Sequence, residues 1–156
     1  MSPSTADRRG GFPPGFLKGV ECAFCSIVAG ETAAHVVLDD DTAVAFLDAR
    51  PLFPGHTLVV PRRHVPTLTD LTDAETGPFF VRVRRVAAVV ERAMDAEGSF
   101  VAANNRVSQS VPHLHVHVVP RRRRDGLRGF FWPRHRYESA EEAERVADLL
   151  RDALRD

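Results

Sequence analysis

Three histidines occupy every second position in the stretch VPHLHVHVVP, which runs from residue 111 to residue 120. Successive side chains of a β-strand point to opposite faces of a sheet, so His113, His115 and His117 are expected on one face. The apolar residues between them then share the other face. This spacing predicts a strand with a core face and a chemically active histidine face.

Three interpretations fit such a row of imidazoles. Imidazole is a common zinc ligand, and a zinc ion with an open position activates water. A neutral imidazole can also attack phosphorus and form a phosphoramidate, if its tautomer is fixed and donors surround the anionic oxygens. Gln109 and Ser110 supply donors just before the histidines. The third interpretation, surface or satisfied core histidines, suits a single histidine better than three in strict alternation.

The composition of the whole chain favours one domain. Its 156 residues are 44% hydrophobic, enough for a single core. The 21 basic and 21 acidic residues balance, so no net charge attracts nucleic acid or a membrane surface. No apolar run is long enough to span a bilayer, and the opening MSPSTADRRGGFPPGFLKG lacks the apolar middle of a secretory signal. A cytoplasmic location is expected.

The elements that must position the histidines follow from the hydrophobic pattern. Residues 1–20 have the composition of a flexible tail, and one domain is expected over residues 21–156. A short helix should end at Gly30. Strands are expected at residues 35–38, 42–48, 56–61, 99–105 and 113–119.

Two capping-box patterns predict longer helices. Thr72 with Glu75 begins an amphipathic helix, in which Pro78 should cause a kink or a later start. Ser139 with Glu142 begins a last helix. The elements together predict an α+β domain with a mainly antiparallel five-stranded sheet, one long central helix and short flanking helices. A doubly wound nucleotide fold is disfavoured, because no glycine-rich turn joins a strand to a helix.

The segment HLHVHVV, preceded by Gln109 and Ser110, resembles the signature of the histidine-triad (HIT) superfamily of nucleotidyl hydrolases and transferases. Upstream, AFLDARPLFPGHTLVVPRRH also resembles that family, which has an acid-bearing strand followed by PGH and an apolar strand. The resemblance covers residues 21 to about 120 well and the segment DGLRGFFWPR less specifically. It implies a HIT-like fold and chemistry on nucleotides.

The resemblance assigns a role to each residue of the histidine stretch. It implies that His115 attacks the α-phosphorus and forms a nucleotidyl-histidine, which water then resolves. It implies that His117 and Gln109 hold phosphate oxygens, that Ser110 assists the leaving group and that His56 orients the triad. A histidine nucleophile needs one nitrogen free and the other held as N–H, so these roles are physically consistent.

The resemblance also implies a nucleoside-binding surface. Asp48 is expected to meet the ribose hydroxyls, because a carboxylate accepts hydrogen bonds from a diol. Asn104 or Asn105 is expected to contact ribose or phosphate, although Ser108 stands where many relatives have glycine before the glutamine. The expected nucleobase pocket, for which plain core packing is an equal alternative, consists of Phe24, Ile27, Phe46 and Leu47.

Cys22 and Cys25 are too close in sequence to staple a fold, and their CxxC spacing suits two thiolates on one metal ion. This stretch resembles family members that begin with the same CxxC and bind zinc. Their two remaining zinc ligands are matched here by His64 and His113. The alternative is two small buried hydrophobes beside an exposed histidine. By resemblance, a structural zinc is expected.

The segment 121–136 combines seven arginines with Phe130, Phe131 and Trp132. Such a mixture can hold single-stranded nucleic acid or the distal phosphates of a dinucleoside polyphosphate. The alternative is a solvated arm whose charge is balanced by the acids of the last helix and whose aromatic residues fill a dimer contact. By resemblance, the segment as a whole is expected to help shape the substrate cleft or the dimer. His35 and His135 match no family role and are expected at the surface.

The function expected from the residues and the resemblance is cleavage at the α-phosphate of a purine nucleotide conjugate by a homodimeric enzyme. The conjugate is expected to be a dinucleoside polyphosphate or a nucleoside phosphoramidate. Three alternatives stay open: a phosphorylase-type transferase, a metal-dependent hydrolase, and a nucleotide-binding or partner-binding module without turnover. Neither a membrane nor a nucleic acid is an expected partner.

Overall fold

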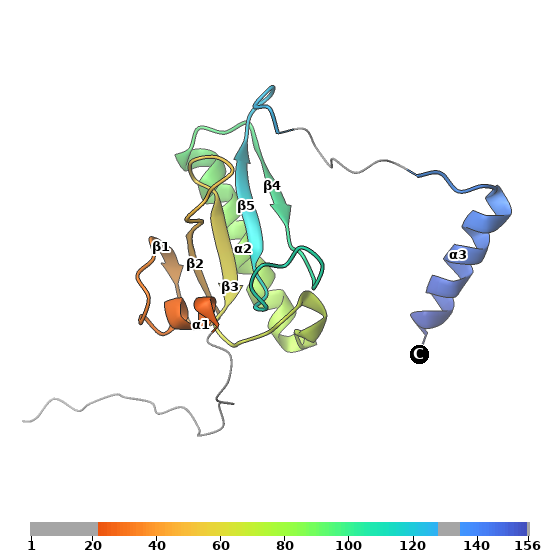
Figure 1. Ribbon diagram of the computed structural model, residues 1–156, viewed down its shortest axis with the longest axis horizontal. Coiled ribbons are helices and arrows are strands. Elements are labelled where there is room, and N and C mark those ends of the chain that lie inside the picture. Colours follow the sequence, from red (N-terminus) through yellow and green to blue (C-terminus); the bar gives the residue numbers. More distant parts are fainter. Residues whose placement is uncertain (1–21, 128–134, 156) are drawn as a thin grey trace, which may run out of the picture. The chain divides into compact units, whose positions relative to one another are not determined.

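The computed structural model of the protein describes residues 22–127 and 135–155. They fall into two compact units, one ending at Arg123 and the other beginning at Arg124. The first unit contains a five-stranded sheet with the order β1-β2-β3-β5-β4 (Figure 1). All neighbouring strands in this sheet are antiparallel, so the predicted α+β class is confirmed.

The five strands are those expected, with different ends. They are β1 (Val36–Asp39), β2 (Ala43–Leu47), β3 (Thr57–Pro61), β4 (Gly98–Ala102) and β5 (Val116–Arg121). The expected histidine strand is therefore wrong in one respect: only His117 lies within β5. The N–H of Leu114 donates to the carbonyl of Val65 at 2.6 Å, so the chain just before β5 bonds to a loop and not to a neighbouring strand. Leu114, Val116 and Val118 still point into the core, and the alternation survives.

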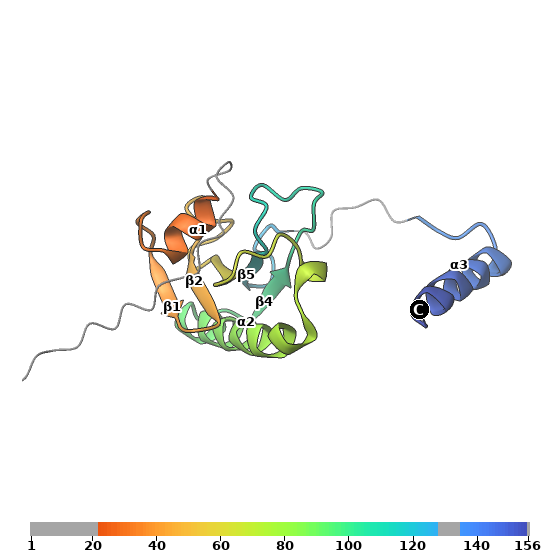
Figure 2. The same ribbon diagram turned by 90° about the horizontal axis from the view of Figure 1, so that it is seen from below.

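Helix α2 (Asp73–Ala93) covers one face of the sheet (Figure 2). The Thr72 side chain accepts from the N–H of Glu75, and the Glu75 carboxylate accepts from the N–H of Thr72, so the predicted capping box is present. Pro78 lies inside the helix and does not move its start. The core between helix and sheet includes Phe79, Val83, Val86 and Val90 on the helix and Ala43, Ala45, Val59, Val116 and Val118 on the strands.

Helix α1 (Ala23–Val28) lies over the opposite face of the sheet (Figure 2). Its Phe24 ring meets the ring of Phe46 edge-on, with 5.4 Å between centroids. A second, smaller core forms there with Val44, Leu58 and Val60. Strands β2 and β3 are thus buried on both faces, because alternate residues along them belong to different cores.

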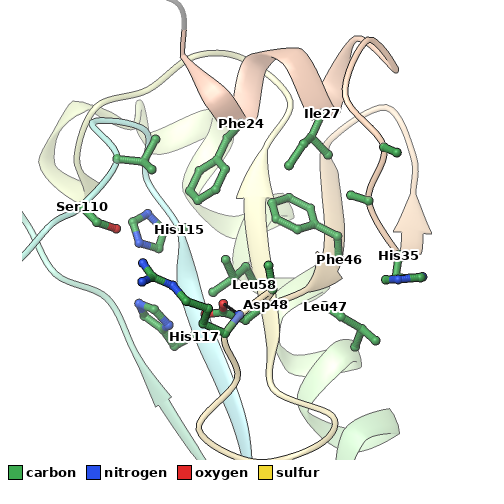
Figure 3. Close-up of a pocket in the computed structure, with 15 residues that line it drawn as sticks. Phe24, Ile27, His35, Phe46, Leu47, Asp48, Leu58, Ser110, His115 and His117 are labelled. Atoms are coloured by element: carbon green, nitrogen blue, oxygen red, sulfur yellow. Dashed lines mark hydrogen bonds between the residues drawn. The ribbon is translucent and has the colours of Figure 1, made fainter.

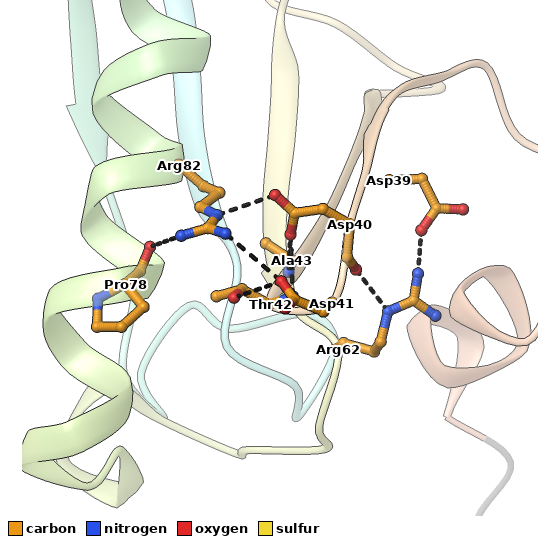
Figure 4. Close-up of polar contacts among 8 residues, drawn as sticks. All are labelled: Asp39, Asp40, Asp41, Thr42, Ala43, Arg62, Pro78 and Arg82. Carbon is orange, nitrogen blue, oxygen red and sulfur yellow. Dashed lines mark hydrogen bonds and ion pairs between the residues drawn. The ribbon is translucent and has the colours of Figure 1, made fainter. Parts of the chain in front are cut away.

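The turn between β1 and β2 is fastened to α2 through Asp40 (Figure 4). The Asp40 carboxylate accepts from the N–H groups of Thr42 and Ala43, at 2.9 and 3.0 Å, and from Arg82 Nε at 2.9 Å. Burial opposes its ionisation, but the Ala43 N–H and the Arg82 guanidinium hold the pKa of Asp40 below its usual value. The start of β2 is thereby fixed on the helix that spans the sheet.

The second unit contains α3 (Ala140–Ala153), the last helix expected from the sequence. The Ser139 side chain accepts from the N–H of Glu142 at 3.1 Å. Leu149, Leu150 and Leu154 are exposed, and the assignment of α3 to the same domain as the sheet stays a prediction. The expected tail at residues 1–20 lies outside the described residues. Among the helices that the structure describes, none has the length and apolar character needed to cross a membrane.

Candidate active site and metal centre

A cleft of about 850 Å³ opens on the α1 side of the sheet (Figure 3). His115, His117 and Ser110 line one end, and Ile27, Phe46 and His35 lie toward the other (Figure 3). The full lining is Phe24, Ile27, Ala33, Ala34, His35, Phe46, Leu47, Asp48, Ala49, Arg50, Leu58, Ser110, Val111, His115 and His117. The cleft therefore has a polar end and an apolar end.

His115 is held in one tautomer by the main chain. Its Nδ1–H donates to the carbonyl of His113 at 2.8 Å, because a carbonyl can only accept. The other ring nitrogen, Nε2, then carries a lone pair. The side chain is buried beneath the edge of the Phe24 ring, with 5.1 Å between ring centroids, and it lines the cleft. A fixed, unprotonated nitrogen is what a histidine nucleophile requires.

His117 receives its tautomer through His56. The Leu52 N–H donates to His56 Nδ1 at 3.1 Å, which puts the His56 proton on Nε2. That N–H donates in turn to His117 Nδ1 at 3.0 Å. His117 must then carry its own proton on Nε2. The chain of hydrogen bonds from Leu52 makes His117 a donor next to the lone pair of His115, whose ring centroid is 5.0 Å from that of His117.

Burial keeps the imidazoles of His117 and His56 neutral. Burial lowers the pKa of His117 to about 4, and electrostatic repulsion between a protonated His117 and the neighbouring imidazoles of His115 and His56 adds to this effect. Burial also lowers the pKa of His56, although the nearby Asp48 carboxylate acts in the opposite direction. At neutral pH each ring therefore has one donor and one acceptor nitrogen, as the hydrogen-bond chain requires.

Asp48 lies where β2 ends, between the histidines and the apolar pocket. Its Oδ2 is 3.7 Å from His56 Nε2, and its Oδ1 accepts from the N–H of Arg50 at 2.8 Å. The carboxylate lines the cleft and is partly exposed, so it has acceptor capacity left for a ligand hydroxyl. The four residues expected in the nucleobase pocket, Phe24, Ile27, Phe46 and Leu47, all line the same cleft.

Two expected substrate-binding residues lie outside the lining of the cleft. The Gln109 side chain accepts from the N–H of Arg106 at 2.8 Å and donates to the carbonyl of Pro66 at 2.6 Å, so both ends are engaged by main chain. Asn104 donates to the carbonyl of Ser108 at 3.3 Å. Ser108 has a φ of 60°, a left-handed conformation that favours glycine.

Sequence reasoning missed two polar residues of the cleft. His35 was expected at the surface; it is exposed, but it also lines the apolar end. Arg50 was given no role, yet it lines the cleft two residues after Asp48. Its place beside the expected ribose ligand is the signal that could have identified it. His135, the other expected surface histidine, is exposed.

The four expected metal ligands come together beside the cleft, although they come from distant parts of the chain. Their ligand atoms all lie within 4.8 Å of one another. Cys25 Sγ is 3.2 Å from His64 Nδ1 and 3.5 Å from His113 Nδ1, and Cys22 Sγ is 3.4 Å from His113 Nδ1. The set of two sulfurs and two imidazole nitrogens matches the donors of a closed zinc site.

The surroundings of this cluster suit a cation. The His113 Nε2–H donates to the carbonyl of Pro61 at 2.9 Å, which leaves the lone pair of Nδ1 facing the sulfurs. Burial and the neighbouring Cys22 sulfur raise the pKa of the Cys25 thiol to about 12. Two thiolates side by side are thus costly by themselves, and a divalent cation removes that cost.

Asp48, His56 and His117 also offer atoms within 4.8 Å of one another. Here the proton pattern opposes a metal. The Leu52 amide places the His56 proton on Nε2, the atom that a cation would need, and His117 Nδ1 already accepts that proton. We interpret this group as a hydrogen-bond relay.

Arg122 and Arg123, in segment 121–136, make contacts within their own chain. Arg122 donates to the carbonyls of Met94 and Asp95, beyond the end of α2, where a positive charge is favourable. Arg123 lies 3.8 Å from Glu97. Residues 128–134, with the expected aromatic cluster, lie outside the described residues.

The family and the fold are shown by comparison with similar proteins. The family model of the HIT domain matches residues 29–124, and the chain belongs to this family. A HIT family protein from Bacillus subtilis has a crystal structure with a TM-score of 0.78 and 29% identity, over 85% of this chain and 96% of that one. A zinc-bound histidine triad family protein from Mycobacterium smegmatis gives a TM-score of 0.65 and 33% identity, over 87% and 98% of the two chains.

Some similar proteins carry the names of enzymes. The bis(5'-nucleosyl)-tetraphosphatase (asymmetrical) of Schizosaccharomyces pombe is 42% identical over 85 residues. The match covers 53% of this chain and 47% of that protein, so it spans about half of the relative's length. The resemblance inferred from the sequence is thus confirmed at the level of the family, in which at least this relative is named as a nucleotide hydrolase.

Proposed function

We propose that the protein cleaves purine nucleotide conjugates at the α-phosphate through a covalent intermediate on His115. The observation that carries this proposal is the pair of opposite tautomers in the cleft: an unprotonated Nε2 on His115 beside a protonated Nε2 on His117. One nitrogen attacks phosphorus while the other donates to a phosphate oxygen. A protein that only bound nucleotides would not need the first nitrogen to be free.

The proposed reaction has two steps. The Nε2 lone pair of His115 attacks the α-phosphorus, a nitrogen–phosphorus bond forms, and the bond to the leaving group breaks. The leaving group takes up a proton from solvent, which the hydroxyl of Ser110 in the cleft relays to it. Water then attacks the same phosphorus and loses a proton, and the electrons of the nitrogen–phosphorus bond return to His115. The His113 carbonyl holds the Nδ1–H throughout, as it does in the free protein.

The lining of the cleft supports the substrate class. Phe24, Ile27, Phe46 and Leu47 offer flat apolar surface to a nucleobase, and Asp48 offers a carboxylate to the ribose hydroxyls at the boundary with the histidines. The name of the S. pombe relative supports a dinucleoside polyphosphate as the conjugate. Phosphorolysis of the same intermediate is the second candidate, because phosphate can take the place of water. Product analysis with added phosphate separates the two.

Replacement of His115 by alanine tests the mechanism. His115→Ala is expected to lower turnover of diadenosine tetraphosphate by at least about a thousandfold, because the nucleophile and its intermediate are lost together. The circular dichroism spectrum and the metal content should stay those of the wild type, since the side chain at position 115 is not a ligand. Wild type quenched in alkaline denaturant, in which a histidine–phosphorus bond is stable, should carry labelled nucleotide on the protein. Turnover retained in the variant would contradict the covalent mechanism.

We also propose that Cys22, Cys25, His64 and His113 hold a structural zinc ion. Zinc would supply cohesion, tying α1 and the chain before β5 to one point; no step of the reaction is assigned to it. The donor set supports this, as does the zinc-bound relative from M. smegmatis. One zinc ion per chain, measured by mass spectrometry of the purified protein, is the expected stoichiometry.

A homodimer with the two sheets side by side is proposed as well. β4 is an edge strand, and its residue Val101 has 44% of its surface exposed. The other edge strand, β1, has an irregular register, which makes it a poorer template for pairing. Val101→Lys is expected to shift the sedimentation of the protein from dimer to monomer. Val107→Lys, at another exposed valine, is the control; a dimer that survives Val101→Lys would exclude this edge.

A further inference from the structure

The segment from Asp48 to Leu52 runs along the relay histidine His56. Asp48 Oδ2 lies 3.7 Å from His56 Nε2, and the Leu52 N–H donates to His56 Nδ1 at 3.1 Å. Arg50 stands between these two contacts, and its own N–H donates to Asp48 Oδ1 at 2.8 Å. The backbone of Arg50 is therefore fixed at the histidine end of the cleft, and its exposed side chain lines the cleft.

The charge balance of the cleft makes this arginine distinctive. Of the 15 residues that line the cleft, Arg50 alone is an arginine or a lysine, and Asp48 alone is an acid. His117 is neutral at physiological pH, since burial lowers its pKa to about 4. Within residues 22–127 and 135–155, the Arg50 guanidinium makes no ion pair with a carboxylate. Six other arginines do: Arg62, Arg63, Arg82, Arg123, Arg151 and Arg155.

An α-phosphate and a polyphosphate make different demands on this end of the cleft. His117 and Ser110 can bond the oxygens of one phosphate as neutral donors. Each further phosphate brings additional negative charge, which neutral donors do not balance. A guanidinium does so, and its planar fork fits phosphate oxygens in pairs.

We propose that Arg50 determines substrate choice by binding the phosphates beyond the one that His115 attacks. The cleft then favours nucleotides whose α-phosphate continues into a polyphosphate chain over nucleoside phosphoramidates, which have no further phosphate. This inference rests on the proposed function, and it selects between the two substrate classes that the function leaves open.

The test compares two substrates with the same adenylyl group. Diadenosine tetraphosphate has phosphates beyond the α-position, and adenosine 5'-phosphoramidate has none. Arg50→Ala should lower kcat/KM for the tetraphosphate by about tenfold or more, the usual effect of losing a hydrogen bond to a charged group. For the phosphoramidate, kcat/KM should change by less than about threefold, about half of that effect in free energy. Equal losses on both substrates would overturn the inference.

The matched control is Arg84→Ala. Arg84 is an exposed arginine of α2, which covers the face of the sheet opposite the cleft, and this variant should leave both kcat/KM values unchanged. A conservative variant, Arg50→Lys, should recover part of the loss on the tetraphosphate, because lysine keeps the charge but not the fork.

A binding measurement separates this inference from the proposed function. Affinities for AMP and for non-hydrolysable α,β-methylene-ADP are measured by calorimetry on wild type and Arg50→Ala. The wild type should prefer the diphosphate analogue, and the variant should lose that preference, whether or not the protein turns over any substrate. If wild type shows the preference but no turnover, the proposed function fails and the Arg50 inference stands. If the preference is absent from wild type or unchanged in the variant, the Arg50 inference fails.

Discussion

His56 controls which nitrogen of His117 faces the cleft, although His56 does not line the cleft itself. The Leu52 N–H fixes the His56 proton on Nε2, and this N–H fixes the tautomer of His117 by donating a hydrogen bond of 3.0 Å to its Nδ1. His115 instead takes its tautomer from the carbonyl of His113. The two imidazoles at the polar end of the cleft are thus set by separate parts of the chain, and each presents a different atom to a substrate.

The lowered pKa of His117 predicts a dependence of stability on pH. The pKa rises from about 4 in the folded chain to about 6.5 on unfolding. The unfolded state therefore binds the proton more readily between these values, and the stabilisation is present above pH 6.5 and is lost as the pH falls towards 4. Chemical denaturation at pH 7.5 and pH 5 should show a smaller loss of unfolding free energy in His117→Gln than in wild type. An equal loss in both proteins would contradict a neutral, half-buried His117.

At the scale of elements, one close approach joins the PGH turn to the end of α2. Gly55 has a φ of 92°, and a Cβ at this position would lie 2.6 Å from Met94 Cγ. Gly55→Ala is expected to lower the unfolding free energy by about 1–3 kcal/mol, through backbone strain and this contact.

A double-mutant cycle separates the two causes of that loss. In a Met94→Ala background the contact is gone and the strain remains, so Gly55→Ala should cost less there than in wild type. The unfolding free energies of the four proteins are measured by urea denaturation. Equal costs in both backgrounds would show that the backbone conformation alone requires glycine at this turn.

The sequence pattern predicted the elements better than their limits. Capping residues such as Thr72 made the start of α2 predictable, because they act within one turn of the chain. The start of β5 was not predictable, because it depends on which distant segment bonds to Leu114, and that partner is Val65 in a loop. The prediction that His113, His115 and His117 lie on the face opposite Leu114, Val116 and Val118 was right even before β5 begins, where strand pairing is absent. The reason is that the apolar side chains are buried in the core there as well.

The candidate site was predictable where residue types restrict chemistry. The spacing of Cys22 and Cys25 indicated a metal from residue type, and His64 was matched to that metal through the family resemblance. The side chain of Gln109 could not be placed, because its two amide bonds depend on the path of a loop with a left-handed Ser108. Arg50 was overlooked because an exposed arginine is common at protein surfaces, and its position two residues after Asp48 was the one signal that could have identified it.

At the scale of the whole molecule, the proposed zinc site and the substrate cleft share helix α1. Cys22 and Cys25 lie at its beginning, and Phe24 and Ile27 face the cleft. Loss of the metal should loosen this helix. Cys25→Ser is expected to abolish zinc binding and to raise KM by about three- to tenfold, or about 0.7–1.4 kcal/mol.

The same variant should change kcat by less, because His115 and His117 depend on other contacts. Steady-state kinetics and metal analysis of the same preparations check both values, with Ser26→Ala on α1 as the control. If zinc is lost while KM stays at its wild-type value, α1 does not need the metal to form its side of the cleft.

His113 divides its contributions between side chain and main chain. Its ring belongs to the metal cluster, and its carbonyl fixes the proton of His115. A carbonyl is present whichever amino acid occupies the position, so a mutation that removes this metal ligand does not remove the group that orients the nucleophile. The two properties can accordingly be inherited separately: a lineage can lose its metal at residue 113 and keep its chemistry at residue 115.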